Sequence, residues 1–199
     1  MPLTTYRKKR DFGVTSEPSG AKRPRKAGRA LSFVVQKHQA TALHYDFRLE
    51  WDGVLLSWAV PKGPSFDPSV KRLAMAVEDH PLDYASFEGV IPEGQYGGGT
   101  VMVWDRGTWE PEEPDVAASL RNGEIAFTLH GEKLQGAWAL IRTRRSERSW
   151  LLIKQRDDAA SEADVAATQS RSVLSKRSMA EIARDEGGDV TKAAKADPR

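Results

Sequence analysis

The residues best suited to chemistry lie in the stretch "QKHQATALHYDFRLEW" (residues 36–51), which holds two of the four histidines of the chain. From His44 onward polar and apolar residues alternate, which puts His44, Asp46 and Arg48 at every second position. Side chains in a β-strand point alternately to its two faces, so these three share one face and the intervening apolar residues share the other. The alternation predicts a strand with one core face and one polar face. An ordinary exposed sheet edge is the alternative for this pattern alone.

His38 precedes this strand and can join its polar face. A hairpin or bend through residues 39–42 would return its imidazole beside His44, and Asp46 would complete a set of two imidazoles and one carboxylate. This set suits Mn²⁺ or Fe²⁺ and leaves coordination positions open. The guanidinium of Arg48 would then lie at the edge of the metal, where it suits a pair of phosphate oxygens. The residues therefore indicate phosphoryl chemistry at a metal ion.

A second group of candidates follows in "VEDHPLDYASFEG" (residues 77–89), where one loop carries His80 and Tyr84. Such a pair can bind or protonate a phosphate oxygen, and we expect His80 to be the group nearest to proton transfer. The following "PEGQYGGGT" lacks the residue order of a phosphate-binding loop, so we interpret it as a bulged turn whose glycines serve as scaffold. His130, beside a turn glycine, is expected at the surface.

The fold is predicted to be all-β, a compact antiparallel β-barrel of about eight strands, because eight short apolar segments alternate with turn residues. Asp52-Gly53 is typical of a tight hairpin, and one short helix is expected between Asp115, as its cap, and Gly123. Most tryptophans are expected in the barrel core, whereas Trp51, at a strand end, could stack on a base. The eight segments are residues 32–38, 43–51, 54–61, 71–78, 99–107, 124–131, 134–143 and 149–155.

Charge is distributed unevenly along the chain. Residues 1–30 carry nine Lys and Arg against two acidic residues, or +7, whereas the remainder carries 21 basic and 26 acidic residues, or −5. A basic arm on such a body is a common source of sequence-independent affinity for nucleic-acid backbones, although a solvated tail is the plain alternative. We expect a basic arm over 1–30, with its first half contributing to the site, a barrel over 31–157, and a partly helical linker over 158–199.

The composition excludes several kinds of site and location. The chain has no cysteine, so disulfides, thiolate metal sites and cysteine nucleophiles are excluded. No apolar run approaches the roughly 20 residues that span a bilayer, and the basic start has no hydrophobic stretch behind it. We therefore expect a cytoplasmic protein without a membrane partner. A monomer is expected, since nothing in the sequence suggests an extended apolar interface.

Two blocks taken together are highly specific, "QKHQATALHYDFRLEWDGVLLSWAVPKGPS" and "VEDHPLDYASFEGVIPEGQYGGGTVMVWDRGTW". They strongly resemble the 3′-phosphoesterase domain of bacterial DNA ligase D, which trims 3′ ends during nonhomologous end joining. The resemblance runs from Tyr6 to about Asp157, and "SVLSKRSMAEIA" is similar to the linker that joins this domain to the ligase module. We therefore expect either an excised domain or a stand-alone relative.

The resemblance implies an activity and assigns roles to residues. The activity is removal of a 3′-terminal ribonucleoside to leave a 3′-phosphate, followed by hydrolysis of that phosphate to a 3′-hydroxyl. The implied metal ligands, for Mn²⁺, are His38, His44 and Asp46, and the implied phosphate contacts are Arg48, His80 and Tyr84. Supporting family positions are matched by Arg10, Asp11, Glu17, Gln36, Lys62, Arg72 and Glu78.

The implied substrate is a DNA primer-template with a 3′-ribonucleotide or 3′-phosphate end, met at the bacterial nucleoid. The implied partners are polymerase and ligase modules of the same pathway and a Ku-type end-binding protein. Two other functions stay open at this point. A 2-His-1-carboxylate Fe(II) oxygenase uses the same ligand types, although the neighbouring phosphate-binding residues argue against it. A noncatalytic module that docks DNA or a repair partner would bind without metal and release no product.

Overall fold

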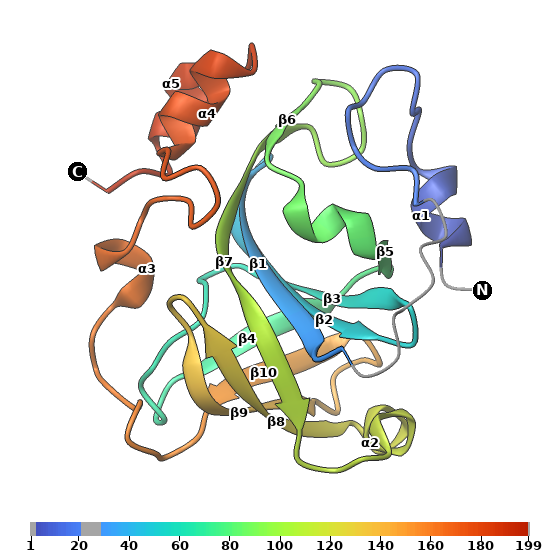
Figure 1. The fold of residues 1–199 in the computed structure, drawn as a ribbon, viewed down its shortest axis with the longest axis vertical. Helices are drawn as coiled ribbons and strands as arrows, with labels where there is room; N and C mark the ends of the chain where they lie inside the picture. The colour runs from blue at the N-terminus through green and yellow to red at the C-terminus, as the bar shows by residue number, and fades with distance from the viewer. Residues whose placement is uncertain (1–2, 21–28, 199) are drawn as a thin grey trace.

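The structure, a computed structural model, describes residues 3–20 and 29–198. Eight antiparallel strands close into a barrel, because β1 pairs with β2 on one side and with β7 on the other (Figure 1). The predicted all-β barrel of about eight strands is therefore confirmed. In order around the barrel the strands are β1 (Leu31–Gln39), β2 (Leu43–Trp51), β3 (Val54–Val60), β4 (Lys71–Ala76), β10 (Ser149–Lys154), β9 (Gln135–Arg142), β8 (Glu124–Gly131) and β7 (Gly99–Pro111).

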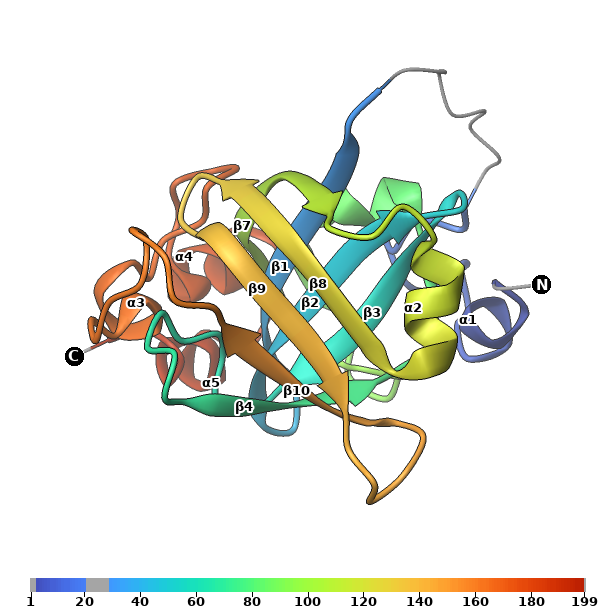
Figure 2. The ribbon, with the colours of Figure 1, turned by 90° about the horizontal axis from the view of Figure 1, so that it is seen from below.

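Short elements decorate this barrel. The two-residue β5 (His80–Pro81) pairs with β3, and β6 (Gly89–Ile91) pairs with β7. Seen from below, α3, α4 and α5 gather on one side of the barrel and α1 lies on the opposite side (Figure 2). The helices are α1 (Thr4–Lys8), the 3₁₀ turn η1 (Leu82–Ser86), α2 (Val116–Asn122), α3 (Val165–Thr168), α4 (Met179–Asp185) and α5 (Val190–Ala194).

Local sequence explains the main turns. Asp52 and Gly53 both adopt positive φ, 46° and 78°, as the two-residue hairpin turn between β2 and β3 requires. Helix α2 is capped as expected, since the Asp115 carboxylate accepts the N–H of Ala118, and Gly123 ends the helix in the left-handed region.

No helix in the described part of the chain is both long and apolar enough to cross a membrane.

The two faces of the β1–β2–β3 wall carry different layers. The inner face packs into the barrel core, where Trp104, Trp109 and Trp138 are fully buried and Trp51 packs half-buried at the edge. The outer face is covered by α1 and η1, whose Tyr6 and Tyr84 form a second apolar cluster with strand residues. This outer layer buries Gln36, Arg48 and the other polar residues on the outer face of β1 and β2, which an exposed sheet edge would leave in water.

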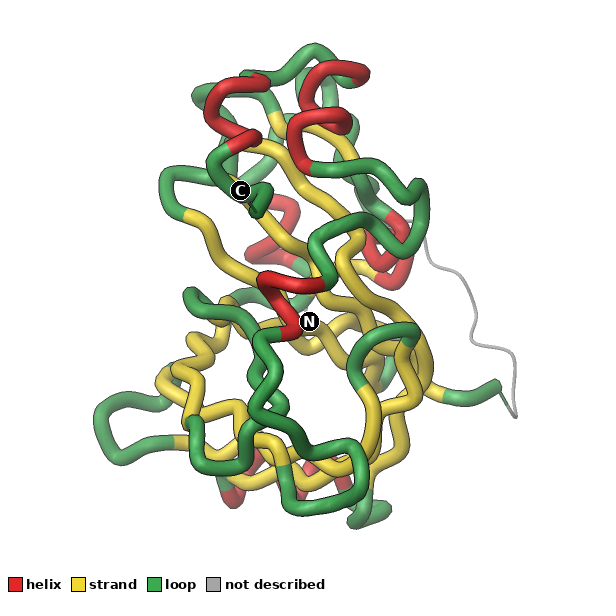
Figure 3. Tube along the Cα trace, turned by 90° about the vertical axis from the view of Figure 1, so that its left-hand side faces the viewer, coloured by secondary structure: helices red, strands yellow, loops and turns green. Residues whose placement is uncertain are grey.

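The tail over 158–198 packs on the barrel, as Figure 3 shows face-on. Met179 and Ile182 of α4 are fully buried in the main core, and the indole of Trp104 donates to the carbonyl of Gln169. The segment expected to be a partly helical linker thus contributes side chains to the barrel core. Its apolar residues are scattered among charged ones, so their pattern does not reveal the surface that receives them.

Part of the predicted arm is also bound to the barrel. Residues 3–20 lie on the outer layer, where Tyr6 is buried and its hydroxyl donates to the carbonyl of Pro18. The four basic residues Lys22, Arg23, Arg25 and Lys26 lie outside the described residues.

We predict that Ile182→Ala lowers the free energy of unfolding by about 2–4 kcal/mol, because it leaves a cavity where α4 meets the barrel. Arg184→Ala, at an exposed position of the same helix, is the matched control and should change stability by less than about 0.5 kcal/mol. Urea unfolding followed by tryptophan fluorescence measures both. Equal, small effects would mean that the tail is not docked in solution.

Candidate functional site

The hairpin of β1 and β2 brings the three predicted metal ligands together on its outer face. His38 pairs directly with His44 in the ladder, and Asp46 lies two residues further along β2. The His38 Nδ1 is 3.6 Å from one carboxylate oxygen of Asp46, and the His44 Nε2 is 3.7 Å from the other. One ligand atom from each of the three residues lies within 4.8 Å of the others. The donor set therefore has the spacing to surround a single ion.

Backbone carbonyls orient both imidazoles. The His38 Nε2 donates to the carbonyl of Gly97 at 2.8 Å, and the His44 Nδ1 donates to the carbonyl of Ala42 at 3.0 Å. A carbonyl can only accept, so these nitrogens carry the hydrogens, and the lone pairs remain on the two nitrogens that face Asp46. Outer contacts of this kind fix the tautomer of metal-binding histidines. The residues thus fit a divalent transition metal.

The charge states also suit metal binding. Burial alone would raise the pKa of Asp46, but the Arg48 guanidinium at 3.1 Å holds it well below its usual range. Burial lowers the pKa of His44 below its ordinary value. A carboxylate and a neutral imidazole are the forms that bind metal, so these ligands need lose no proton first.

Arg48 is more deeply buried than the two cations of the N-terminal segment, Lys9 and Arg10. Its side chain is 2% exposed, and its Nε donates to the Gln36 amide oxygen while its Nη1 donates to the Ser57 hydroxyl, both at 2.8 Å. The Gln36 amide donates in turn to the carbonyls of Tyr84 and Phe87, so it ties the η1 turn to the strand wall. Gln36 therefore positions both Arg48 and the segment that carries Tyr84.

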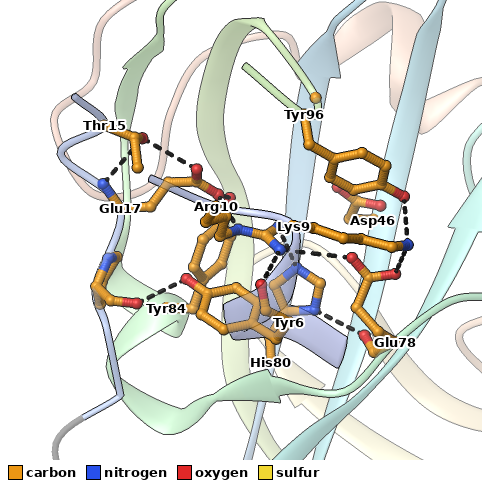
Figure 4. A network of polar contacts seen from close by, with 12 residues as sticks. Tyr6, Lys9, Arg10, Thr15, Glu17, Asp46, Glu78, His80, Tyr84 and Tyr96 are labelled. Atoms are coloured by element: carbon orange, nitrogen blue, oxygen red, sulfur yellow. Dashed lines mark hydrogen bonds and ion pairs between the residues drawn. The ribbon is translucent and has the colours of Figure 1, made fainter. Parts of the chain in front are cut away.

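Residues from the N-terminal segment complete the site (Figure 4). Arg10 donates to Glu17 Oε1 at 2.8 Å, and the Tyr84 hydroxyl donates to the same oxygen at 2.9 Å. Thr15 donates to the other carboxylate oxygen at 3.0 Å. Burial, reinforced by the charge of Glu17, raises the pKa of Tyr84 well above its ordinary value, so it remains a phenol that can donate.

His80 is held as a neutral imidazole. Its Nδ1 donates to the carbonyl of Glu78 at 2.8 Å, and its Nε2 faces Arg10 Nη2 at 3.3 Å, so Nε2 is the acceptor. Burial, then the charges of Arg48 and Arg10, hold the pKa of His80 well below its usual range. The Glu78 carboxylate forms ion pairs with Arg10 and with Lys9. Its negative charge offsets part of the positive charge of Arg10 beside His80.

Three residues named by the resemblance lie apart from this network. Asp11 is exposed and accepts the N–H of Gly13, so it shapes the turn that leads to Thr15. Lys62 is exposed beyond the end of β3. Arg72 shares its strand face with Ala74, which points into the core, and its Nε is buried without a hydrogen-bond partner among the described residues. No hydrogen bond or ion pair among the described residues joins these three to the metal ligands.

Other contributors were not predicted. Ser57 could have been found, because it is the polar residue on the outer face of an otherwise apolar strand, opposite Arg48. Lys9 and Thr15 carry no local signal that would join them to a site. The loop interpreted as a bulged turn also contributes chemically, since its Gly97 carbonyl holds His38.

Comparisons with known proteins agree with this site. A family model described as the DNA Ligase D 3′-phosphoesterase domain matches residues 36–142. The chain is 54% identical over 183 residues to the multifunctional non-homologous end joining protein LigD of Pseudomonas aeruginosa, covering 89% of this chain and 22% of that protein. It is 47% identical over 165 residues to the multifunctional non-homologous end joining DNA repair protein LigD of Mycobacterium tuberculosis, covering 81% and 21%. The chain thus spans about a fifth of the length of these relatives, and it belongs to the DNA ligase D 3′-phosphoesterase domain family.

Proposed function

We propose that this protein is a Mn²⁺-dependent phosphoesterase that removes 3′-terminal ribonucleosides and 3′-phosphates from DNA strands. The observation that carries the proposal is the buried Arg48 guanidinium against Asp46 of the metal cluster, 3.1 Å away. A metal site flanked by a fixed guanidinium suits the two nonbridging oxygens of a phosphate, which neither an oxygenase nor a simple docking surface requires. Membership of the ligase D family supports the choice of DNA ends as substrate.

Each group of the site has a separate role in the proposed reaction. His38, His44 and Asp46 would hold the ion, which when bound supplies a Lewis acid for a phosphate oxygen. Arg48 has five N–H donors, and its three bonds to protein leave two for the substrate. His80 is the group proposed nearest to proton transfer, through its unprotonated Nε2.

Tyr84 has a single hydroxyl hydrogen, which it donates to Glu17. For this hydroxyl to contact a phosphate oxygen, the phosphate must replace Glu17 as the acceptor. We propose that this exchange accompanies substrate binding, while Arg10 keeps Glu17 in place through its own bond to the carboxylate.

The biological setting follows the names of the relatives, which are multifunctional proteins of nonhomologous end joining. We propose that the protein acts beside polymerase and ligase modules of that pathway and with a Ku-type end-binding protein, in the bacterial cytoplasm at the nucleoid. The monomeric state expected from the sequence belongs to the same proposal.

We predict that a labelled DNA primer ending in one or two ribonucleotides, annealed to a longer template, is shortened at its 3′ end when Mn²⁺ is present. Phosphate-ended products should appear first and hydroxyl-ended products later, and EDTA should abolish both. Denaturing gels resolve the two products. An intact primer that still shifts on a native gel would favour the noncatalytic module, and oxygen-dependent turnover would favour the oxygenase.

We predict that His44→Ala and Asp46→Asn weaken Mn²⁺ binding by more than the roughly 10- to 100-fold typical of losing an outer contact, because each removes a direct ligand. Titration calorimetry with Mn²⁺ measures this without any substrate. His130→Ala, at an exposed histidine on β8, is the matched control and should bind as the parent does. Unchanged affinity in Asp46→Asn would refute the ligand assignment.

We propose that the basic residues between 22 and 26 contact DNA phosphates. Deleting residues 1–30 would also remove Arg10 and Glu17, so the test replaces only Lys22, Arg23, Arg25 and Lys26 by alanine. The slope of log K against log salt on duplex DNA should become shallower by up to about 3.6, since each contacted phosphate contributes about 0.9. Arg184→Ala with Lys195→Ala, exposed on the tail, is the control, and an unchanged slope in the arm variant would exclude this role.

A further inference from the structure

Tyr96 is the exposed aromatic residue in the described chain, with 48% of its surface accessible. The other tyrosines, Tyr6, Tyr45 and Tyr84, are buried, and the tryptophans are buried or half-buried in the core. The Tyr96 ring belongs to neither apolar cluster of the described residues. The exposed Tyr96 ring is accessible to a ligand, and its place on the surface determines which ligand it can contact.

Tyr96 lies at the rim of the metal cluster. The next residue, Gly97, accepts the N–H of His38 through its carbonyl at 2.8 Å. A Cβ at Gly97 would be 3.5 Å from the His38 ring, so the backbone of this loop lies against the imidazole. Consecutive Cα atoms are about 3.8 Å apart, which brings Tyr96 close to the same ligand. Figure 4 shows the Tyr96 ring next to the Lys9 side chain.

The ring is also held in place. Lys9 Nζ donates to the Tyr96 hydroxyl at 3.1 Å, lies 4.3 Å from the ring centroid, and pairs with Glu78 at 3.0 Å. The Arg10 guanidinium is 5.6 Å from the same ring. A ring that is already fixed loses little conformational freedom when a second flat group stacks on it.

We infer that Tyr96 is a stacking platform for the terminal nucleobase of the strand whose 3′-phosphate lies at the metal cluster and Arg48. The inference rests on the proposed function, because a base and its own 3′-phosphate are separated by one sugar and must bind side by side. Stacking uses the π-face that every base has, so the platform accepts any base. Sequence tolerance of this kind suits an activity on broken DNA ends.

The test uses equilibrium binding of a fluorescent DNA oligonucleotide ending in a 3′-phosphate, in EDTA, so that no turnover occurs. Tyr96→Ala should weaken binding at least about fivefold, the lower end of what stacking on one base contributes. Tyr96→Phe keeps the ring and should restore binding. Leu174→Ala, at another exposed apolar position, is the matched control and should bind as the parent does.

A second oligonucleotide, identical except for an abasic terminal nucleotide, separates stacking from a structural role. Parent and Tyr96→Ala proteins should bind it equally, because there is no base to stack. An equal loss on both oligonucleotides, or a loss in Tyr96→Phe, would overturn the inference and make Tyr96 a support for Lys9. Since binding is measured without catalysis, a base-dependent effect of Tyr96 together with no turnover on any 3′ end would retain the platform and reject only the proposed function.

Discussion

The pairing of Arg48 with Asp46 inside the outer layer is the interaction on which the rest of the site depends. A buried guanidinium without a partner is strongly unfavourable, and removing one member of such a pair typically destabilises a protein by about 3–5 kcal/mol. Here the charge is matched by one carboxylate and by two neutral acceptors, Gln36 and Ser57. The same contacts keep Asp46 ionised beside the two imidazoles and hold the η1 turn over the strands. The bonds of Arg48 and Gln36 thus both stabilise the outer layer and position the groups of the candidate site.

Much of the fold and the centre of the site could be predicted because the relevant signals are local. The eight apolar segments correspond to the eight barrel strands, and Asp52-Gly53 closes the predicted turn. His38, His44, Asp46 and Arg48 come together through one hairpin, in which alternation fixes the face and the short connection fixes the register. Sequence reasoning succeeds where a single pair of neighbouring strands supplies the whole arrangement.

The contacts that the sequence did not predict join residues far apart in the chain or involve backbone atoms. The Tyr84 hydroxyl reaches Glu17 across 67 positions, and the His38 imidazole reaches a glycine carbonyl 59 positions away, which no pattern of residue types reveals. The tail is predicted to be a linker because it is rich in Ala, Ser and charged residues, whereas its few apolar residues find their partners only on the closed barrel. Arg72, a position matched by resemblance, shares a strand face with the buried Ala74, and its supporting role stays a prediction.

Residues 6–17 supply side chains to the candidate site although they lie before the region that matches the family model. The match to the family model covers residues 36–142, yet Arg10, Thr15 and Glu17 stand before it and Met179 and Ile182 after it. A chain trimmed to the matched region would lack the acceptor of Tyr84, the cation beside His80 and part of the core. The folded unit is therefore wider than the matched region, because trimming to that region would also remove β10 and the start of β1 and so open the barrel.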